Sequence, residues 1–163
     1  MNKKILFALL VLLLASLQIR PRKVDDMAIQ FDGSTVGQRV TWTSSAMDIS
    51  QISILTWANF DTLPAAVRDL WAAWTGSQFK YYMYFAPDSK FYFGTRFSTH
   101  NGEWGIGGFS TGQPTLLSVT YDASSPTNDP LMYRDATLVS ETETQTPAGT
   151  VLTGANVIRL GGF

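Results

Sequence analysis

Short stretches rich in β-branched and aromatic residues recur along this chain, and clusters of Gly, Pro, Ser and Asn separate them. This alternation is typical of β-strands joined by turns. Many short strands at this spacing predict an all-β fold, an antiparallel β-sandwich, with at most one helical turn near Pro64. The predicted strands span residues 28–31, 38–43, 51–60, 69–74, 79–86, 90–97, 103–106, 115–121, 130–134, 137–144 and 156–161.

One predicted hairpin assigns its side chains to the two faces of the sheet. Residues 79–86 and 90–97 flank a turn at Pro87–Ser89. A loop with an odd number of residues groups the Phe and Met side chains on a core side, whereas an even loop would pair Phe85 with Lys90. The odd loop pairs Phe85 with Phe91, Tyr84 with Tyr92, and Met83 with Phe93. The polar-aromatic face then carries Tyr82, Tyr84, Tyr92 and Gly94, with Lys80 and Arg96 at its end.

The first residues have the pattern of an export signal. Residues 1–4 include two lysines, and residues 5–17 are an unbroken run of apolar and small residues. As a helix, this run spans roughly 20 Å, which is short of the ~30 Å hydrocarbon core of a membrane. We therefore expect residues 1–26 to be a signal peptide rather than a stable membrane span, and residues 27–163 to form one secreted, extracellular domain. Alternatively, Met27 is the true start, which would leave the protein in the cytoplasm.

Composition excludes several classes of function. No cysteine occurs among the 163 residues, which excludes disulfides, a cysteine-based zinc cluster and a thiol nucleophile. The net charge of −1 gives no indication of the positively charged surface that binds nucleic acid. His100 is the only histidine and lies among turn-forming residues, so we expect a solvated loop side chain rather than a catalytic one.

Five segments, in order along the chain, resemble a known domain family. They are Ala28–Gly33, Ile52–Phe60, Thr115–Asp122, Leu131–Val139 and Val157–Gly162. Their order and spacing resemble the laminin-G-like domains of the concanavalin A-like lectin/glucanase superfamily. Within them, Trp57, Thr120–Asp122 and Leu160–Gly162 match motifs of that family. The resemblance implies a jelly-roll domain whose function is non-catalytic recognition, either carbohydrate binding or adhesion to an extracellular protein.

The chain departs from the family pattern at three places. Pro114–Leu116 stand where the family has Trp-His-His, and the family's Asp-Gly turn is Asp135–Ala136. Family members also continue with a further strand after Gly161–Gly162, whereas this chain stops at Phe163. We therefore expect a C-terminally incomplete jelly roll, a fragment, with an open sheet edge at 28–31 where another chain could pair. This edge favours, as the alternative function, a structural protein of a phage tail, virion or other assembly.

Aromatic side chains on the polar-aromatic face form the candidate carbohydrate site, because ring faces stack on pyranose rings. The candidates are Tyr82, Tyr84, Tyr92 and Trp104. The other tryptophans are expected to pack in the core, namely Trp42, Trp57, Trp71 and Trp74. A glycan-active enzyme is the third hypothesis. It is disfavoured because the glycosidase carboxylate motif is absent, and because Glu141 and Glu143 alternate onto an expected solvated face.

Calcium is the one cofactor that the resemblance implies, since many members of the family bind Ca²⁺ at the rim of the domain. The candidate ligands are Asp32, Asp122, Asn128 and Asp129. Calcium takes six to eight oxygen ligands, which Asp and Asn side chains can supply. The alternative is that these residues only shape turns, as Asp and Asn commonly do.

Overall fold

Two antiparallel β-sheets form the described part of the chain, which comprises residues 40–43 (backbone only), 49–76, 78–154 and 157–161 of a computed structural model. The strands are β1 (Val40–Thr43), β2 (Gln51–Ala58), β3 (Arg68–Thr75), β4 (Gln78–Phe85), β5 (Phe91–Thr95), β6 (Gly102–Ile106), β7 (Thr115–Asp122), β8 (Leu131–Arg134), β9 (Thr137–Val139), β10 (Thr142–Gln145) and β11 (Val157–Leu160). One sheet has the order β1-β11-β3-β4-β5-β6-β10 and the other the order β2-β7-β8-β9. The predicted all-β antiparallel sandwich is confirmed.

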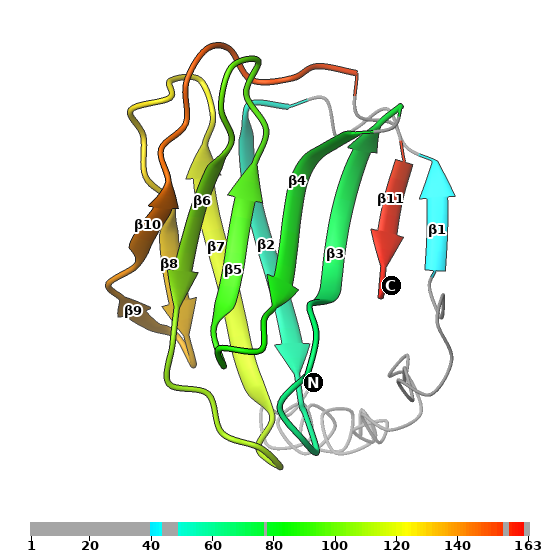
Figure 1. Cartoon of the computed structure of the whole chain (residues 1–163), viewed down its shortest axis with the longest axis vertical. Helices are drawn as coiled ribbons and strands as arrows, with labels where there is room; N and C mark the ends of the chain where they lie inside the picture. The colour runs from blue at the N-terminus through cyan, green and yellow to red at the C-terminus, as the bar shows by residue number, and fades with distance from the viewer. Residues whose placement is uncertain (1–39, 44–48, 77, 155–156, 162–163) are drawn as a thin grey trace, which may run out of the picture. The chain divides into compact units, whose positions relative to one another are not determined.

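The two sheets face each other across one hydrophobic core. Figure 1 shows the four-stranded sheet behind the side of the seven-stranded sheet that runs from β4 to β10. Alternate residues of the central strands point into the space between the sheets, because successive side chains on a strand point to opposite faces. The fully buried members include Met83, Phe85, Phe91, Phe93, Trp104, Leu117, Val119 and Met132. Each such side chain contributes about 1.5–3 kcal/mol by leaving water, so the core fixes which residues appear on the two outer faces.

The register predicted for the first hairpin is confirmed. β4 and β5 pair Phe85 with Phe91, Met83 with Phe93, Tyr84 with Tyr92, and Tyr82 with Gly94. In the turn, the Ser89 amide donates to the Ala86 carbonyl at 3.1 Å, and Ser89 has a positive φ of 62°. The Phe and Met side chains therefore face the core, and the tyrosines face outward from the seven-stranded sheet.

A β-bulge near the start of β4 changes the alternation there. Ala73 pairs with Tyr81, whereas Trp74 pairs with Phe79, so Lys80 is the extra residue. Lys80 is only 1% exposed, and its ammonium lies 5.5 Å from the centroid of the Tyr81 ring. The prediction that Lys80 lies at the end of the polar-aromatic face is therefore wrong. Phe79 reaches that face instead, because the bulge shifts the alternation by one residue.

The predicted strand 137–144 is divided between the two sheets, which corrects the sequence-based boundary. β9 pairs with β8, whereas β10 pairs with β6 of the opposite sheet. The preceding turn at Asp135–Ala136 has φ values of 50° and 62°, the two positive values that a type I′ turn requires. Asp135 also braces the turn, since its Oδ1 accepts a hydrogen bond from the Leu116 amide at 2.9 Å.

The segment before β3 contains no helical turn, so the single turn that the sequence allowed near Pro64 does not form. Residues 61–67 consist of bends and irregular backbone that lead directly into β3. Within the part of the chain that the structure describes, no helix is long and apolar enough to cross a membrane. Several predictions lie outside the described residues: the leader 1–26, the start at Met27, the strand 28–31 with its open edge, and the chain end at Gly162–Phe163.

Candidate functional site

A row of aromatic rings covers the outer side of the seven-stranded sheet. We call this surface the tyrosine face, and its members are Trp74, Phe79, Tyr82, Tyr84, Tyr92 and Glu103. Tyr84 stacks on Tyr92 with ring centroids 5.0 Å apart and an interplanar angle of 15°, and on Tyr82 at 6.0 Å and 22°. Phe79 extends the row at 5.5 Å from Tyr82. The row follows from the period of a strand, which places residues 82 and 84 on the same side.

Two glycines give the tyrosine rings room to lie against the sheet. Gly94 is the cross-strand partner of Tyr82, and a Cβ atom at this position would overlap the Tyr82 ring. Gly105 is the cross-strand partner of Tyr92, and a Cβ atom there would lie 2.7 Å from the Tyr92 ring. Each glycine therefore determines where the tyrosine on the neighbouring strand can lie.

Glu103 is the hydrogen-bond acceptor at the centre of the tyrosine face. Its side chain extends from β6 and is 9% exposed. Its Oε2 accepts hydrogen bonds from the hydroxyls of Tyr82 at 3.2 Å and Tyr84 at 3.0 Å, and its Oε1 accepts one from the Thr144 hydroxyl at 2.9 Å. A carboxylate removed from water requires such donors, because an unpaired buried charge is costly. The bond from Thr144 holds Glu103, and the other two hold the tyrosine rings in defined orientations.

The environment of the tyrosines keeps their hydroxyls protonated. Burial raises the pKa of Tyr82 and of Tyr84 well above the usual range, and the charge and hydrogen bonds of Glu103 raise it further. Burial, together with a 2.6 Å hydrogen bond to Asp88, raises the pKa of Tyr92 to about 12. All three phenols are therefore neutral at physiological pH.

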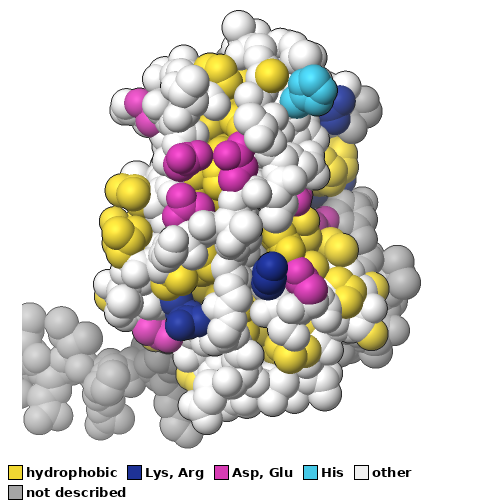
Figure 2. Space-filling view, turned by 60° about the vertical axis from the view of Figure 1, so that its left-hand side comes forward, with side chains coloured by type: hydrophobic (Ala, Val, Ile, Leu, Met, Phe, Trp, Pro, Cys, Tyr) yellow, Lys and Arg dark blue, Asp and Glu magenta, His cyan; other side chains and the backbone are white. Residues whose placement is uncertain are grey.

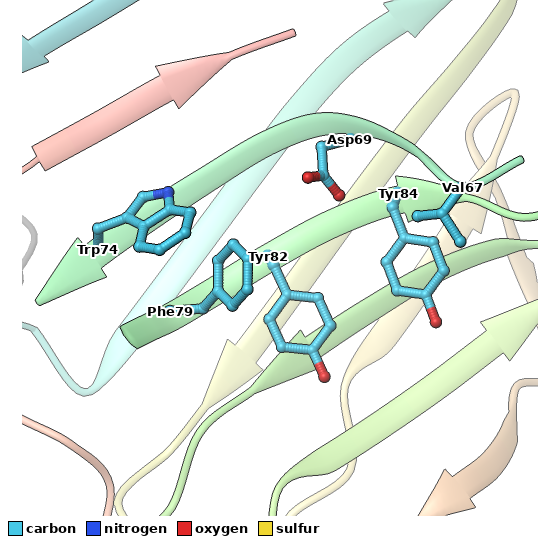
Figure 3. A pocket seen from close by; sticks show the side chains of 6 residues that line it. All are labelled: Val67, Asp69, Trp74, Phe79, Tyr82 and Tyr84. Atoms are coloured by element: carbon cyan, nitrogen blue, oxygen red, sulfur yellow. The ribbon is translucent and has the colours of Figure 1, made fainter. Parts of the chain in front are cut away.

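An open pocket of about 350 Å³ lies at one end of the tyrosine face. Figure 3 shows its lining residues, which come from β4, from β3 and from the residue before β3: Val67, Asp69, Trp74, Phe79, Tyr82 and Tyr84. The Trp74 ring contacts Phe79 with centroids 4.1 Å apart, and the Arg159 guanidinium lies 4.1 Å from the Trp74 ring centroid. Burial raises the pKa of Asp69 to about 6, so this carboxyl changes charge near neutral pH.

The tyrosines differ in their access to solvent. Tyr92 is only 8% exposed, whereas Tyr82 and Tyr84 are partly exposed and line the pocket. The partly exposed rings beside the pocket are therefore those of Tyr82 and Tyr84, together with Trp74 and Phe79. Tyr92, which was predicted to contact the ligand, is buried and stacks on Tyr84 from the neighbouring strand.

Trp104 lies on the other side of the sheet, which corrects its assignment to the candidate site. Its side chain is 0% exposed, and its ring packs in the core 5.3 Å from Tyr121. The indole Nε1–H donates to Asp129 Oδ1 at 3.0 Å. Alternation along β6 explains the placement, because Glu103 and Gly105 point to the tyrosine face and Trp104 must then point inward.

The remaining tryptophans occupy different environments, although all were expected to pack in the core. Trp71 packs against the core, as predicted. Trp74 lies on the tyrosine face instead, and Trp57 is 66% exposed on the outer side of the four-stranded sheet. Both predictions are wrong, because aromatic character alone does not indicate which face of a strand a residue occupies. The side chain of Trp42 lies outside the described residues.

Three of the four candidate calcium ligands lie together at one rim of the sandwich. Asp122, Asn128 and Asp129 line a shallow groove of about 660 Å³, whereas Asp32 lies outside the described residues. The two Asp122 oxygens accept hydrogen bonds from Gln51 Nε2 at 3.0 Å and from the Ser124 amide at 2.9 Å. These bonds, that from Gln51 foremost, hold the pKa of Asp122 below its usual value.

The other two rim residues are likewise engaged within the chain. Asn128 Nδ2 donates to the Asp122 carbonyl at 2.9 Å, and Asp129 accepts the bond from Trp104. Across the described ranges, no group of three or more His, Asp or Glu side chains has the geometry to hold a metal ion. The geometry of this rim is that of turn residues that bond their own backbone, and it gives no support to a calcium site.

Asp69 and Glu103, two of the carboxylates at the tyrosine face, are widely spaced. Asp69 lies on β3 and Glu103 on β6, three strands apart in the sheet, which corresponds to roughly 14 Å at the usual strand spacing. Glycoside hydrolysis needs two carboxyl groups about 5–10 Å apart. Glu143 is exposed on β10 and Glu141 precedes that strand. His100 is exposed, as expected, and its backbone forms an isolated antiparallel bridge with Ala148.

No protein-family model matches the chain, and no curated protein matches it significantly. The interpretation of the site therefore rests on its geometry. The sequence pattern identified the three tyrosines and missed Asp69, Trp74, Phe79 and Glu103. Glu103 could have been predicted from the alternation of side chains along β6. Trp104 is buried, so its neighbour Glu103 must point to the outer face.

Proposed function

We propose that the tyrosine face is a non-catalytic binding site for a carbohydrate. The observation that carries the proposal is the row of partly exposed rings on β4, oriented by Glu103 and ending in a pocket that contains Asp69. Aromatic faces offer apolar contact to the C–H faces of a pyranose, and a few fixed polar groups orient its hydroxyls. Because the rings are already held in place, binding orders few side chains.

The size and chemistry of the pocket limit the ligand. Its volume of about 350 Å³ is at the small end of ligand pockets, which span about 300–1,000 Å³. A short glycan segment that lies along Tyr82 and Tyr84 fits this description better than a large apolar ligand. The Asp69 carboxylate supplies a hydrogen-bond acceptor for sugar hydroxyls at neutral pH, because it is deprotonated above about pH 6.

The test is a glycan array followed by calorimetric titration of the full-length protein with the best soluble, monovalent oligosaccharide. We expect Trp74→Ala and Tyr84→Ala each to weaken binding by at least about tenfold. Trp57→Ala is the matched control, since this exposed tryptophan lies on the opposite sheet and should leave the affinity unchanged. Failure to bind any glycan, or equal losses for Trp57→Ala and Trp74→Ala, would refute the proposal.

We also propose that the protein is extracellular and that it binds the carbohydrate without cleaving it. The apolar run at residues 5–17 supports export, and N-terminal sequencing of protein recovered from the medium tests it. The wide spacing of Asp69 and Glu103 argues against glycan hydrolysis. Incubation of the protein with the bound oligosaccharide tests this point, and release of a shorter sugar that is lost in Glu103→Gln would establish an enzyme instead.

A structural role in a larger assembly, such as a phage tail or virion, is the second candidate. The observation that favours it is the exposure of Leu55, Trp57 and Leu138, which form an uncharged outer surface on the four-stranded sheet. Electron microscopy of the concentrated protein tests this role. Filaments or rings would support it, whereas particles no larger than a dimer would oppose it.

A further inference from the structure

The outer side of the four-stranded sheet is an apolar surface that nothing described in the chain covers. Strand pairing places Leu55, Ser118, Tyr133 and Leu138 in one row across β2, β7, β8 and β9. Trp57 and Leu131 lie one row to either side. We call these six residues the leucine face. Leu55 is 68% exposed, Trp57 66%, Leu138 57% and Leu131 50%. In Figure 2, which turns the β8–β10 side forward, hydrophobic side chains protrude at the left of the view.

Charge is nearly absent from this surface. Asp122 is the only charged residue among the outward positions of β2, β7, β8 and β9, and it lies at the rim. Its carboxylate already accepts hydrogen bonds from Gln51 and Ser124. Isolated exposed leucines are ordinary, but an uncharged cluster that includes a tryptophan marks an interaction surface.

We propose that the leucine face is the interface of a homodimer, in which two copies of this chain pack their four-stranded sheets face to face. The central row is self-complementary. A twofold axis parallel to the strands, in the plane between the copies, places β2 of one copy opposite β9 of the other. Leu55 then meets Leu138 of the second copy. The small Ser118 meets the large Tyr133, so the two surfaces interdigitate.

The size of the surface suits a small interface. Its four strands have eight, eight, four and three residues, and at about 3.3 Å per residue and 4.8 Å between strands they give a footprint of roughly 360 Å². A standard interface takes about 800 Å² of accessible surface from each partner, and upright side chains expose more area than a flat footprint. The lack of charge means that two copies meet without like-charge repulsion. We expect a dissociation constant on the order of micromolar.

Sedimentation velocity of the full-length protein between about 1 and 200 µM gives the first test. We expect the mass to shift from one chain to two over this range, and Leu138→Glu to abolish the shift. Val67→Glu is the matched control, because Val67 is an exposed apolar residue, at 48%, that lines the pocket of the other sheet. A single-chain mass at all concentrations, or a dimer that survives Leu138→Glu, would overturn the proposal.

Cysteine cross-linking tests the arrangement of the two copies, since the native chain contains no cysteine. Leu55 and Leu138 lie three strands apart within one chain, roughly 14 Å. Facing residues of two packed sheets lie about 10 Å apart, so we expect an equimolar mixture of Leu55→Cys and Leu138→Cys proteins to form a mixed dimer with a short thiol-specific cross-linker that spans about 10 Å. Each variant alone should remain uncross-linked. Equal cross-linking in the single variants and in the mixture would overturn the arrangement.

Discussion

The two outer faces of the sandwich differ in how their side chains interact with one another. On the tyrosine face, hydroxyl groups of Tyr82 and Tyr84 share the carboxylate of Glu103, and glycines make room for the rings. On the leucine face, Leu55 and Leu138 stand in water without such partners. A face held by internal hydrogen bonds is ordered before a polar ligand arrives. Exposed apolar side chains are stabilised only when they are removed from water, which suits contact with another protein.

Among variants that test the difference between the two faces, Glu103→Ala is expected to change stability most. It leaves the hydroxyls of Tyr82 and Tyr84 without their acceptor and leaves Thr144 only the backbone carbonyl of residue 103, which we expect to lower the free energy of unfolding by about 3 kcal/mol. Urea denaturation measures this loss. The exposed Glu143→Ala serves as the control and should change stability by less than about 0.5 kcal/mol. If both variants behaved alike, Glu103 would not be the element that orders the tyrosine face.

The next effect is expected for Gly94→Ala. The added methyl group overlaps the Tyr82 ring, so Tyr82 must move away from Glu103. We expect a loss of about 1–3 kcal/mol of stability together with weaker glycan binding. Gly107→Ala is the matched control, since the nearest atom to its Cβ is Lys90 Cγ at 3.8 Å, an ordinary contact. Thermal unfolding and calorimetry test the pair, and an unchanged affinity in Gly94→Ala would show that Tyr82 does not contact the ligand.

The difference between the faces was only partly predictable from the sequence. Alternation and an odd hairpin loop correctly placed Tyr82, Tyr84 and Tyr92 together, because register follows from the need to bury Phe85 and Phe91. The same rule, applied to β6, separates Glu103 from Trp104. The bulge at Lys80 was not predictable, since the extra residue is specified by pairing with β3 and not by the local pattern.

The leucine face was missed for a different physical reason. β2 is apolar at many positions on both of its sides, so periodicity does not indicate which side is buried. Trp57 was assigned to the core on its size alone. The structure shows that Ile52 and Ala58 of this strand point inward instead. Only the three-dimensional structure shows that an apolar residue of such a strand lies on the outer face.

A smaller effect is expected from Asp69 as the pH changes. Burial raises its pKa to about 6 in the folded protein, above the ordinary value of 3.8 for an aspartate in water. The folded state therefore binds more protons between these values, and stability falls as the pH rises from about 4 to about 6. Allowing for the partial exposure of this carboxyl, we expect a loss on the order of 1 kcal/mol. Asp69→Asn should remove that pH dependence in urea titrations at pH 4 and pH 7, whereas a slope that persists would assign it to other groups.

The smallest effect on the folded chain is expected for Trp57→Ala. Its ring is 66% exposed, so truncation should alter the unfolding free energy of the dilute, monomeric protein by less than about 0.5 kcal/mol. At high concentration the same variant should dimerise more weakly, because the ring is then removed from water only in the wild-type dimer. Unfolding measured at two protein concentrations separates the two contributions. A large loss in dilute solution would mean that Trp57 stabilises the fold itself, and the leucine face would then differ less from the core than its exposure indicates.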